Sequence, residues 1–548
     1  MKKRVISSIL VLVLLSVIFA GCTSEKPSDT GNAKTPAPTS SDSSNDDNND
    51  DLPEVYPIEG DPVISYAVGV SQHVTAVSEW EDTPFFKAWQ EQTGINLELI
   101  EIADVTIEIV HMPDFSLLVA SGDYPDIISA NWNSYSGGAA KAIEDEIVIP
   151  IDDYIEKFAP DYLKELESNE EWMKSVKTPK GNFTGFYQLR TAPALNSFGM
   201  IIRKDWLDQL NLSVPTTTDE FYNTLTAFKN EMDATAPLSL PIGNLRDMGR
   251  FGLITSPFDL VSTGYYHVDG TVHYGAYESQ YKDVLTWLNK LYSDGLLDNN
   301  VLTLDGATSS SNIMNDISGI TTGYASGGMG NWLTTMKDVN PDYALAGVGS
   351  LIKTSGEKAY FGQRQDSISV LSAITSNCDD IETAVKFLNY GYTEPGNLLM
   401  YYGIEGESFE FIDGYPYYTD FVKNHPDGLS FAQALSQYDY SPANGPFVAN
   451  GDYSAQTYND AQLDALNVWR NNDVMDHYIP SMMIDAADVD EYASITSEVF
   501  TYESEQFALF VTGERSLDEF DDYISVLESM GIKRMIEIYQ NAFDVFNQ

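Results

Sequence analysis

The sequence predicts an α/β fold, because strand patterns and helix patterns alternate along the first part of the globular chain. Apolar, β-branched segments are separated by segments in which large apolar residues recur at helical spacing. Hydrophobic residues make up 43% and aromatic residues 12% of the 548 residues, which is enough for packed cores. Strand–helix–strand repetition at this spacing implies parallel strands joined by right-handed crossovers.

The elements of this fold follow one another in chain order. Val63–Val70 is apolar and β-branched, as expected of a strand. The segment from Pro84 carries Phe85, Phe86 and Trp89 at helical spacing and stops at Gly94. The next expected elements are strands at 97–102 and 126–130 and a helix at 113–121.

Capping boxes predict the starts of two later helices. Thr217 and Glu220 have the spacing at which each side chain can accept from the backbone amide of the other, and Ser516 and Glu519 repeat it. The sequence also predicts a strand at 199–204 and a last helix at 532–546.

The N-terminus has the pattern of a signal peptide, predicted for residues 1–21. Basic residues precede a 15-residue apolar run from Ile6 to Ala20, which is shorter than the ~20 residues that span a bilayer. Ala20-Gly21-Cys22 resembles a bacterial lipobox, in which the peptidase cuts before a cysteine that then carries lipid. We therefore expect a lipid anchor at Cys22 on the extracellular face of the cell membrane. The alternative is an ordinary secretory signal followed by an incidental cysteine.

Residues 22–58 are predicted to be a disordered acidic tether. Thr23 to Asp51 is rich in Ser, Thr, Asn, Asp and Pro and has no aromatic residue. Such a segment cannot bury enough apolar surface to offset the entropy of ordering it.

The charge balance excludes one class of partner. With 82 acidic and 30 basic residues the formal net charge is −52. Phosphate binding needs clustered Lys and Arg, so no nucleic-acid partner is expected. Cys378 is the one cysteine besides Cys22 and is expected to be a small buried hydrophobe.

Several motifs carry a resemblance to a known family. They are Leu117–Ile128, Ile202–Leu210, Glu382–Tyr392, Tyr402–Glu407 and Met530–Tyr539. In this order, behind a lipobox, they resemble the family 1 extracellular solute-binding proteins, and within them a long lipoprotein branch of Gram-positive bacteria. The resemblance implies a type II periplasmic-binding-protein-like fold, with two α/β lobes, hinge crossings and a ligand cleft. It also implies capture of an oligosaccharide for the permease subunits of an ABC importer, by a protein expected to be a monomer.

The expected lobe boundaries follow from the same resemblance. Residues 59–195 and 365–430 are assigned to the first lobe, and residues 196–364 and 431–548 to the second.

Aromatic residues after predicted strands are the candidate sugar platforms. Sugars pack their C–H faces on flat rings and need polar partners for their hydroxyls. Asn131, Trp132 and Tyr135 follow the strand that ends at Ala130, and Trp132 is the first choice for stacking. The alternative is that Trp132 packs into the lobe under its own loop.

Further candidates come from matched segments of the family. Tyr187, Gln188 and Arg190 lie before the first expected hinge crossing, with a plain edge-strand role as the alternative. Tyr324 and Trp332 flank a glycine-rich segment, where inward packing of Trp332 is the alternative.

Arg364 and Asp366 precede a buried strand and have two interpretations. They could hydrogen-bond sugar hydroxyls or form an ion pair between the lobes. Arg190, Arg246, Arg250 and Arg364 could together form a basic patch in the cleft; without one, the acidic balance favours a neutral glycan over a polyuronate.

No enzymatic activity, cofactor or metal is expected. The chain has no HExxH, GxSxG or P-loop motif. His267 and His273 could face one another on a hairpin but would be an incomplete metal site. Ser175–Asn182, where some alginate-binding relatives carry a calcium loop, lacks alternating acidic ligands.

We therefore expect capture of an oligosaccharide by closure of two lobes. The alternatives are a surface-attached glycan-binding adhesin without transport, and a peptide or signalling sensor.

Overall fold

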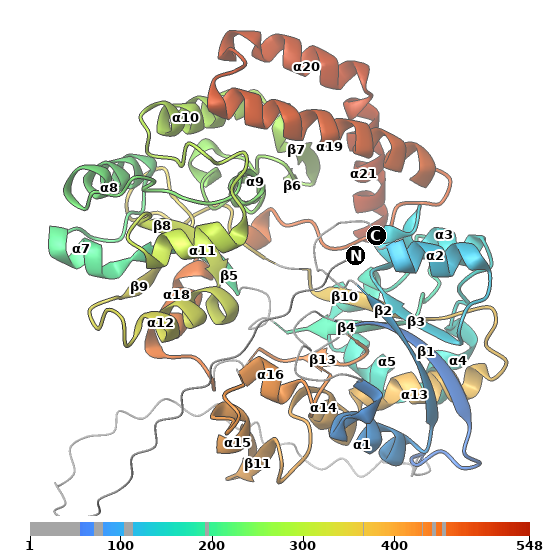
Figure 1. Ribbon diagram of the computed structural model, residues 1–548. Helices are drawn as coiled ribbons and strands as arrows, with labels where there is room; N and C mark the ends of the chain where they lie inside the picture. The colour runs from blue at the N-terminus through green and yellow to red at the C-terminus, as the bar shows by residue number, and fades with distance from the viewer. Residues whose placement is uncertain are drawn as a thin grey trace, which may run out of the picture. The chain divides into compact units, whose positions relative to one another are not determined.

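The computed structural model describes residues 55–70, 80–103, 113–191, 197–364, 366–429, 431–440, 445–451 and 456–548 (Figure 1). The chain separates into the units Met1–Glu54 and Val55–Gln548, and every described residue belongs to the second. The predicted signal peptide, Cys22 and the tether up to residue 54 lie outside the described residues. Within the described ranges, no helix is both long and apolar enough to cross a membrane.

The first lobe is built on a six-stranded sheet in the order β13-β4-β10-β3-β1-β2. The strands are β1 Val63–Val70, β2 Asn96–Ala103, β3 Ile127–Ala130, β4 Phe186–Arg190, β10 Ile368–Ile374 and β13 Val448–Ala449. β1 pairs in parallel with both β2 and β3, as the alternation of strands and helices predicts. β10 enters antiparallel between β3 and β4, so the complete sheet is mixed.

Helix α1, Pro84–Thr93, shows why these elements begin and end where they do. The Thr83 hydroxyl accepts from the Phe86 amide at 3.3 Å, and Pro84 occupies the first helical turn. Gly94 ends the helix with a φ of 73°, a left-handed conformation that glycine adopts without strain.

The first lobe also contains a separate two-stranded hairpin, β11–β12, and, among its described residues, nine further α-helices. They are α2 Pro113–Ser121, α3 Gly138–Glu144, α4 Asp152–Phe158, α5 Pro160–Glu167, α6 Glu170–Ser175, α13 Ile381–Asn389, α14 Glu394–Tyr401, α15 Asp420–Lys423 and α16 Phe431–Leu435; the hairpin strands are β11 Phe409–Ile412 and β12 Tyr415–Tyr418.

Aromatic rings fill the core of the first lobe, which extends beyond residue 430. The Trp89 and Phe387 rings stack at 4.8 Å, and the Tyr66 and Tyr440 hydroxyls meet at 2.6 Å. The same cluster continues to Ala449, because β13 pairs with β4. Residues just after 430, which the resemblance assigns to the second lobe, therefore pack with the first lobe.

The second lobe has a three-stranded antiparallel sheet in the order β8-β5-β9, not a parallel one. Its strands are β5 Phe198–Arg203, β8 Ile320–Tyr324 and β9 Leu345–Val348, with a separate hairpin of β6 Tyr265–Val268 and β7 Thr271–Tyr274. The helices are α7 Lys204–Leu210, α8 Thr218–Glu231, α9 Ile242–Arg250, α10 Tyr281–Ser293, α11 Gly306–Met314, α12 Asn331–Met336, α18 Asp460–Trp469, α19 Val489–Thr512, α20 Phe520–Ser529 and α21 Ile532–Phe546.

The two predicted capping boxes have different outcomes. Thr217 and Glu220 cap α8 reciprocally, so this prediction is confirmed. The Ser516 hydroxyl instead accepts from the Asp518 amide at 3.2 Å, because a 3-10 turn at Leu517–Glu519 precedes α20.

A buried ion pair joins two helices of the second lobe. Arg246 of α9 donates to one carboxylate oxygen of Glu503 on α19, at 2.9 and 2.6 Å. Tyr281 of α10 donates to the other oxygen at 3.2 Å. The Glu503 side chain is 0% exposed, so these contacts replace all of its hydration.

The β6–β7 hairpin separates the two histidines of the incomplete metal site considered from the sequence. His267 is opposite Val272 and His273 is opposite Tyr266, so the two imidazoles lie on different faces. His273 contacts Glu278 at 2.8 Å, whereas the His267 ring lies 6.5 Å from that of His477.

We expect His267 to make stability depend on pH. Burial, and then the neighbouring His477, lower the pKa of His267 in the folded chain. Below the ordinary value of about 6.5 the unfolded chain therefore binds more protons, and the folded state loses stability as the pH falls from about 7 towards 5. Denaturation of the wild type and His267→Gln at pH 7.5 and 5.5 would measure this. A difference in stability between the two proteins that does not change with pH would contradict the prediction.

Candidate functional site

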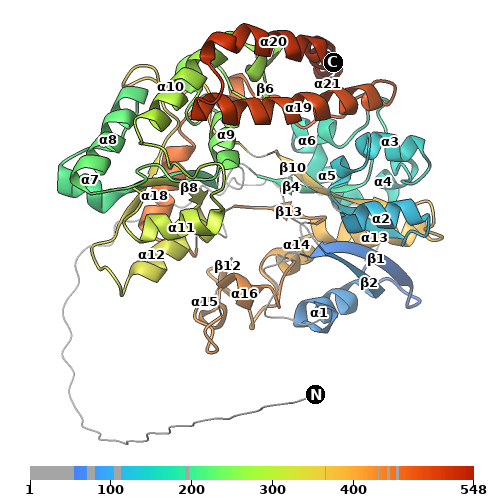
Figure 2. The same ribbon diagram turned by 45° about the horizontal axis from the view of Figure 1, so that its top comes forward.

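The candidate site lies where strands of the first lobe end toward the second. Ligands of open α/β sheets bind beyond the carboxyl ends of strands. In Figure 1 β13, β4 and β10 form the side of the first sheet nearest β5 and β8, and in Figure 2 the same three strands face β8. β4 ends at Arg190, β8 ends at Tyr324, and Asp366 lies just before β10.

Arg190 is a half-buried cation at this position. Its amide donates to Ser367 O at 2.8 Å, its Nε to Gln188 Oε1 at 3.1 Å and its Nη2 to Ser369 Oγ at 2.9 Å. Burial lowers the pKa of Arg190, while the nearby Asp366 carboxylate and the hydroxyls of Tyr324 and Tyr401 raise it. These groups come from both lobes, so Arg190 lies where the lobes approach each other.

Tyr324 offers the most accessible ring among the predicted aromatic residues. Its side chain is 44% exposed, and its ring packs edge-on against Phe198 with 5.1 Å between centroids. Phe198 in turn lies 6.3 Å from Phe251. Sequence reasoning missed Phe198 and Phe251, although Phe198 directly precedes the predicted strand at 199–204. This geometry supports the nomination of Tyr324.

Arg364 forms an ion pair between the lobes, which was one of its two interpretations. Its partner is Glu171 and not Asp366. Its Nη2 donates to both carboxylate oxygens of Glu171 on α6, at 2.9 and 3.1 Å. The guanidinium also lies 4.1 Å from the centroid of the Tyr478 ring. Tyr478 donates to Asp366 Oδ1 at 3.3 Å, and Ser367 donates to Glu171. Glu171 and Tyr478 carry no sequence signal that points to this contact.

The structure places Trp132 in the core. It is 2% exposed, its ring lies edge-on to Phe115 at 5.2 Å, and its Nε1 donates to Ile128 O at 3.3 Å. This burial favours the packing interpretation over sugar stacking. Asn131 accepts from the Asn133 amide, and the Tyr135 hydroxyl donates to Asp145 at 2.6 Å, so both have local partners.

Two other nominated aromatic residues are also buried. Tyr187 is 7% exposed, and its hydroxyl lies 2.8 Å from Thr184 Oγ1. Trp332 is 5% exposed and packs in a core cluster of the second lobe with Met329 and Trp469. For Trp332 this geometry favours the inward-packing alternative. Arg190, Tyr324 and Asp366 are thus the nominated residues that the structure brings together.

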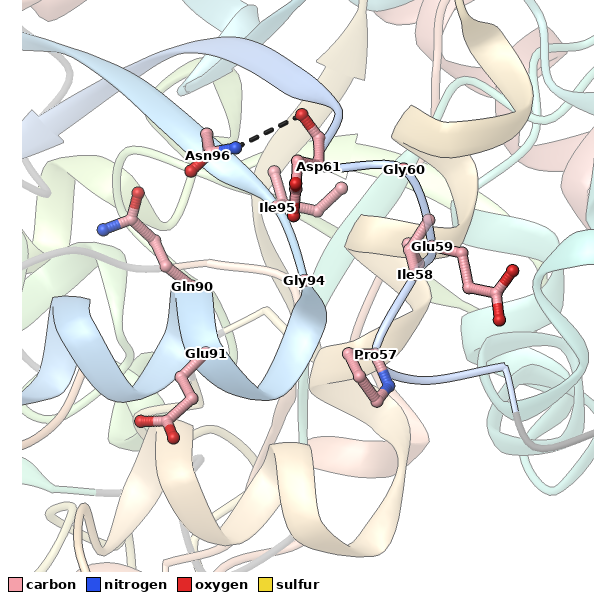
Figure 3. Close-up of a pocket in the computed structure, with 10 residues that line it drawn as sticks. All are labelled: Pro57, Ile58, Glu59, Gly60, Asp61, Gln90, Glu91, Gly94, Ile95 and Asn96. Carbon is pink, nitrogen blue, oxygen red and sulfur yellow. Dashed lines mark hydrogen bonds between the residues drawn. The ribbon is translucent and has the colours of Figure 1, made fainter.

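Two pockets of the described surface lie away from these residues. One of about 560 Å³ is formed by the residues before β1, the end of α1 and the start of β2 (Figure 3). In it Asn96 Nδ2 donates to Asp61 O at 3.2 Å. This pocket lies at the amino ends of β1 and β2, the edge opposite to the one where α/β sheets bind ligands. A smaller one lies beside Tyr277 and Phe520.

Metal-ligating groups are not assembled in the described part of the chain. No three side chains of His, Cys, Asp or Glu gather there as metal ligands. In the loop expected to lack calcium ligands, Lys180 pairs with Glu144 and the Thr178 amide donates to Asn182 O at 2.9 Å. Burial raises the pKa of Cys378 to about 12, so its thiol stays protonated at neutral pH.

A protein-family model matches much of the chain. The model of the family described as bacterial extracellular solute-binding protein matches residues 75–397.

Curated relatives and a solved structure extend the similarity. Lipoprotein LipO of Bacillus subtilis (strain 168) is 23% identical over 84% of this chain and 90% of its own length. The fructooligosaccharide ABC transporter substrate-binding protein FusA of Streptococcus pneumoniae serotype 4 (strain ATCC BAA-334 / TIGR4) is 23% identical over 83% of this chain and 86% of its own. The alginate-binding protein AlgQ2, solved without calcium ion, superposes with a TM-score of 0.72 over 90% of this chain and 99% of its own, at 19% identity.

Proposed function

This chain belongs to the bacterial extracellular solute-binding proteins, and from that premise we propose that it captures an oligosaccharide by closure of its lobes and delivers it to the permease of an ABC importer. The family and the type II periplasmic-binding-protein-like fold expected from the sequence are both confirmed. The family is one of solute-binding proteins rather than enzymes, and it includes sugar-binding members such as FusA.

The convergence of Arg190, Tyr324 and Asp366 is the observation that supports an oligosaccharide as ligand. They come from β4, from β8 and from the crossing that leads into β10. A ring with an accessible face can hold the C–H face of a sugar, while a guanidinium donates to hydroxyls and a carboxylate accepts from them. Residues from both lobes that act on one ligand would couple binding to closure.

Closure would follow from contacts that only the closed form completes. A ligand held by Arg190 on one lobe and Tyr324 on the other gains more contacts when the lobes approach. It therefore shifts the population toward the closed form by its differential affinity. The Arg364–Glu171 pair lies at the crossing about which such a motion would turn.

The cellular setting belongs to the same proposal. Cys22 would carry the lipid that holds the protein on the outer face of the cell membrane, and a monomer would present its ligand to the permease subunits. The lipobox pattern and the relative named as a lipoprotein support the anchor.

A ligand screen followed by scattering tests this function. We expect one class of oligosaccharide to raise the melting temperature, with about 3–4 kcal/mol of stabilisation at 100–1,000 times its dissociation constant. The same oligosaccharide should reduce the radius of gyration in small-angle scattering, and Tyr324→Ala should shift the titration to higher concentration. If no oligosaccharide stabilises the protein, capture of a sugar is wrong; if one binds and the radius does not change, closure is wrong.

A further inference from the structure

The cationic groups that could attract an acidic ligand are mostly neutralised by their neighbours. Arg364 is paired with Glu171 and Arg246 with Glu503, the latter inside the second lobe. The side chain of Arg250 lies outside the described residues. Among the described members of the possible basic patch, Arg190 alone has no ion pair within 4 Å of described residues.

Arg190 keeps hydrogen-bonding capacity for a ligand. A guanidinium has five N–H groups, and here Nε and Nη2 each donate once to a neutral oxygen. Within the described residues, Nη1 makes no hydrogen bond. One edge of the guanidinium is therefore available.

Asp366 opposes this charge from the segment that leads into β10. The Arg190 amide donates to Ser367 O, which places Asp366 one residue from the backbone position opposite Arg190. The Asp366 side chain is exposed, and its carboxylate lies close enough to Arg190 to act on it electrostatically. The Asp366 carboxylate and the hydroxyl of the exposed Tyr324 thus both act electrostatically on the Arg190 guanidinium, although neither forms an ion pair or a hydrogen bond with it among the described residues.

We propose that Arg190 and Asp366 form a charge filter that selects a neutral oligosaccharide and rejects a uronate. This inference rests on the proposed function and names the substrate class of the same site.

The chemistry of the two ligand classes explains the selection. A sugar hydroxyl both donates and accepts, so neighbouring hydroxyls can satisfy Arg190 and Asp366 together. A carboxylate accepts only. It could pair with Arg190 but would face the Asp366 carboxylate, and like charges brought together in a partly dehydrated cleft repel strongly. The net charge of −52 adds a long-range repulsion of the same sign.

The test uses matched ligands that differ only in charge. Each pair has the same length and linkage, with CH₂OH or carboxylate at carbon 6, such as α-1,4-galactotriose and α-1,4-trigalacturonate. A pair can also be made from any ligand found in the screen, by oxidising its primary hydroxyls or by reducing its carboxylates. Isothermal titration then gives the ratio of the two affinities for each protein variant.

We expect the wild type to bind the neutral member at least tenfold more tightly than the acidic one. Asp366→Asn keeps a side chain that can bind Tyr478 but removes the repulsion, so the affinity for the acidic member should rise at least tenfold relative to the neutral one. Glu410→Gln is the matched control, because it removes the same charge from an exposed position on β11 and should leave the ratio unchanged.

The possible results distinguish a failure of the charge filter from a failure of the proposed function. A wild type that prefers the uronate, or an Asp366→Asn protein with the wild-type ratio, overturns the charge filter and leaves oligosaccharide capture standing. If the protein binds neither member of any pair and no sugar of the screen, oligosaccharide capture is wrong, and the charge filter is then wrong as well.

Discussion

Replacement of Trp132 by alanine should lower the free energy of unfolding of the first lobe by about 3–5 kcal/mol and leave sugar affinity nearly unchanged. The ring is 2% exposed and packs edge-on against Phe115 of α2, so its removal leaves a cavity between that helix and β3. Urea denaturation would measure the loss in the transition of the first lobe, and titration with the identified sugar would measure affinity.

Tyr324→Ala is the matched variant, for which we expect a loss of sugar affinity with little loss of stability. Its ring is 44% exposed, so truncation should cost little stability. If the ring stacks on a sugar, affinity should fall by about 1–3 kcal/mol. If instead Trp132→Ala lost affinity at unchanged stability, the stacking role first assigned to Trp132 would be correct and the packing interpretation wrong.

Glu503→Ala should destabilise the second lobe by about 3–5 kcal/mol. The change leaves Arg246, whose side chain is 12% exposed, without its carboxylate, and leaves the Tyr281 hydroxyl buried without its acceptor. The penalty comes from an uncompensated buried charge, so removing both charges should cost much less. We expect the double variant Arg246→Met/Glu503→Leu to recover most of the stability.

An exposed ion pair provides the control for this experiment. Lys353 and Asp259 are 65% and 52% exposed, and such pairs contribute about 0–1 kcal/mol. Lys353→Ala should therefore change the denaturation midpoint only slightly. A double variant as unstable as Glu503→Ala alone would show that packing, and not the charge, accounts for the loss.

Local sequence signals predicted most of the fold, because helix caps and terminating glycines depend only on residues that are close together in the sequence. The helix that begins at Pro84 and ends before Gly94 follows from its cap and its terminating glycine. Parallel pairing of β1 with β2 and β3 follows from the short crossovers between them. The antiparallel entry of β10 could not be predicted in this way, because its partners β3 and β4 lie far away in the sequence.

The candidate site was predicted less well, for a related reason. Whether an aromatic residue after a strand points to solvent or to the core depends on distant partners. Trp132 packs inward against Phe115 of α2, whereas Tyr324 contacts Phe198 edge-on and stays exposed. Arg364 has the same limitation, since its partner Glu171 belongs to a helix of the other lobe.

The position of β10 also sets the order in which the chain can fold. β10 fills the space between β3 and β4, yet the ribosome makes it only after all the strands of the second lobe, and β13 follows later still. Until then the facing edges of β3 and β4 have no partner and can pair wrongly. Contacts over such sequence separations make folding slow, since a long loop must close before they form. A nascent chain that stops short of Ile368 therefore cannot complete its first sheet, and the lobe that begins the sequence is finished only near the end of synthesis.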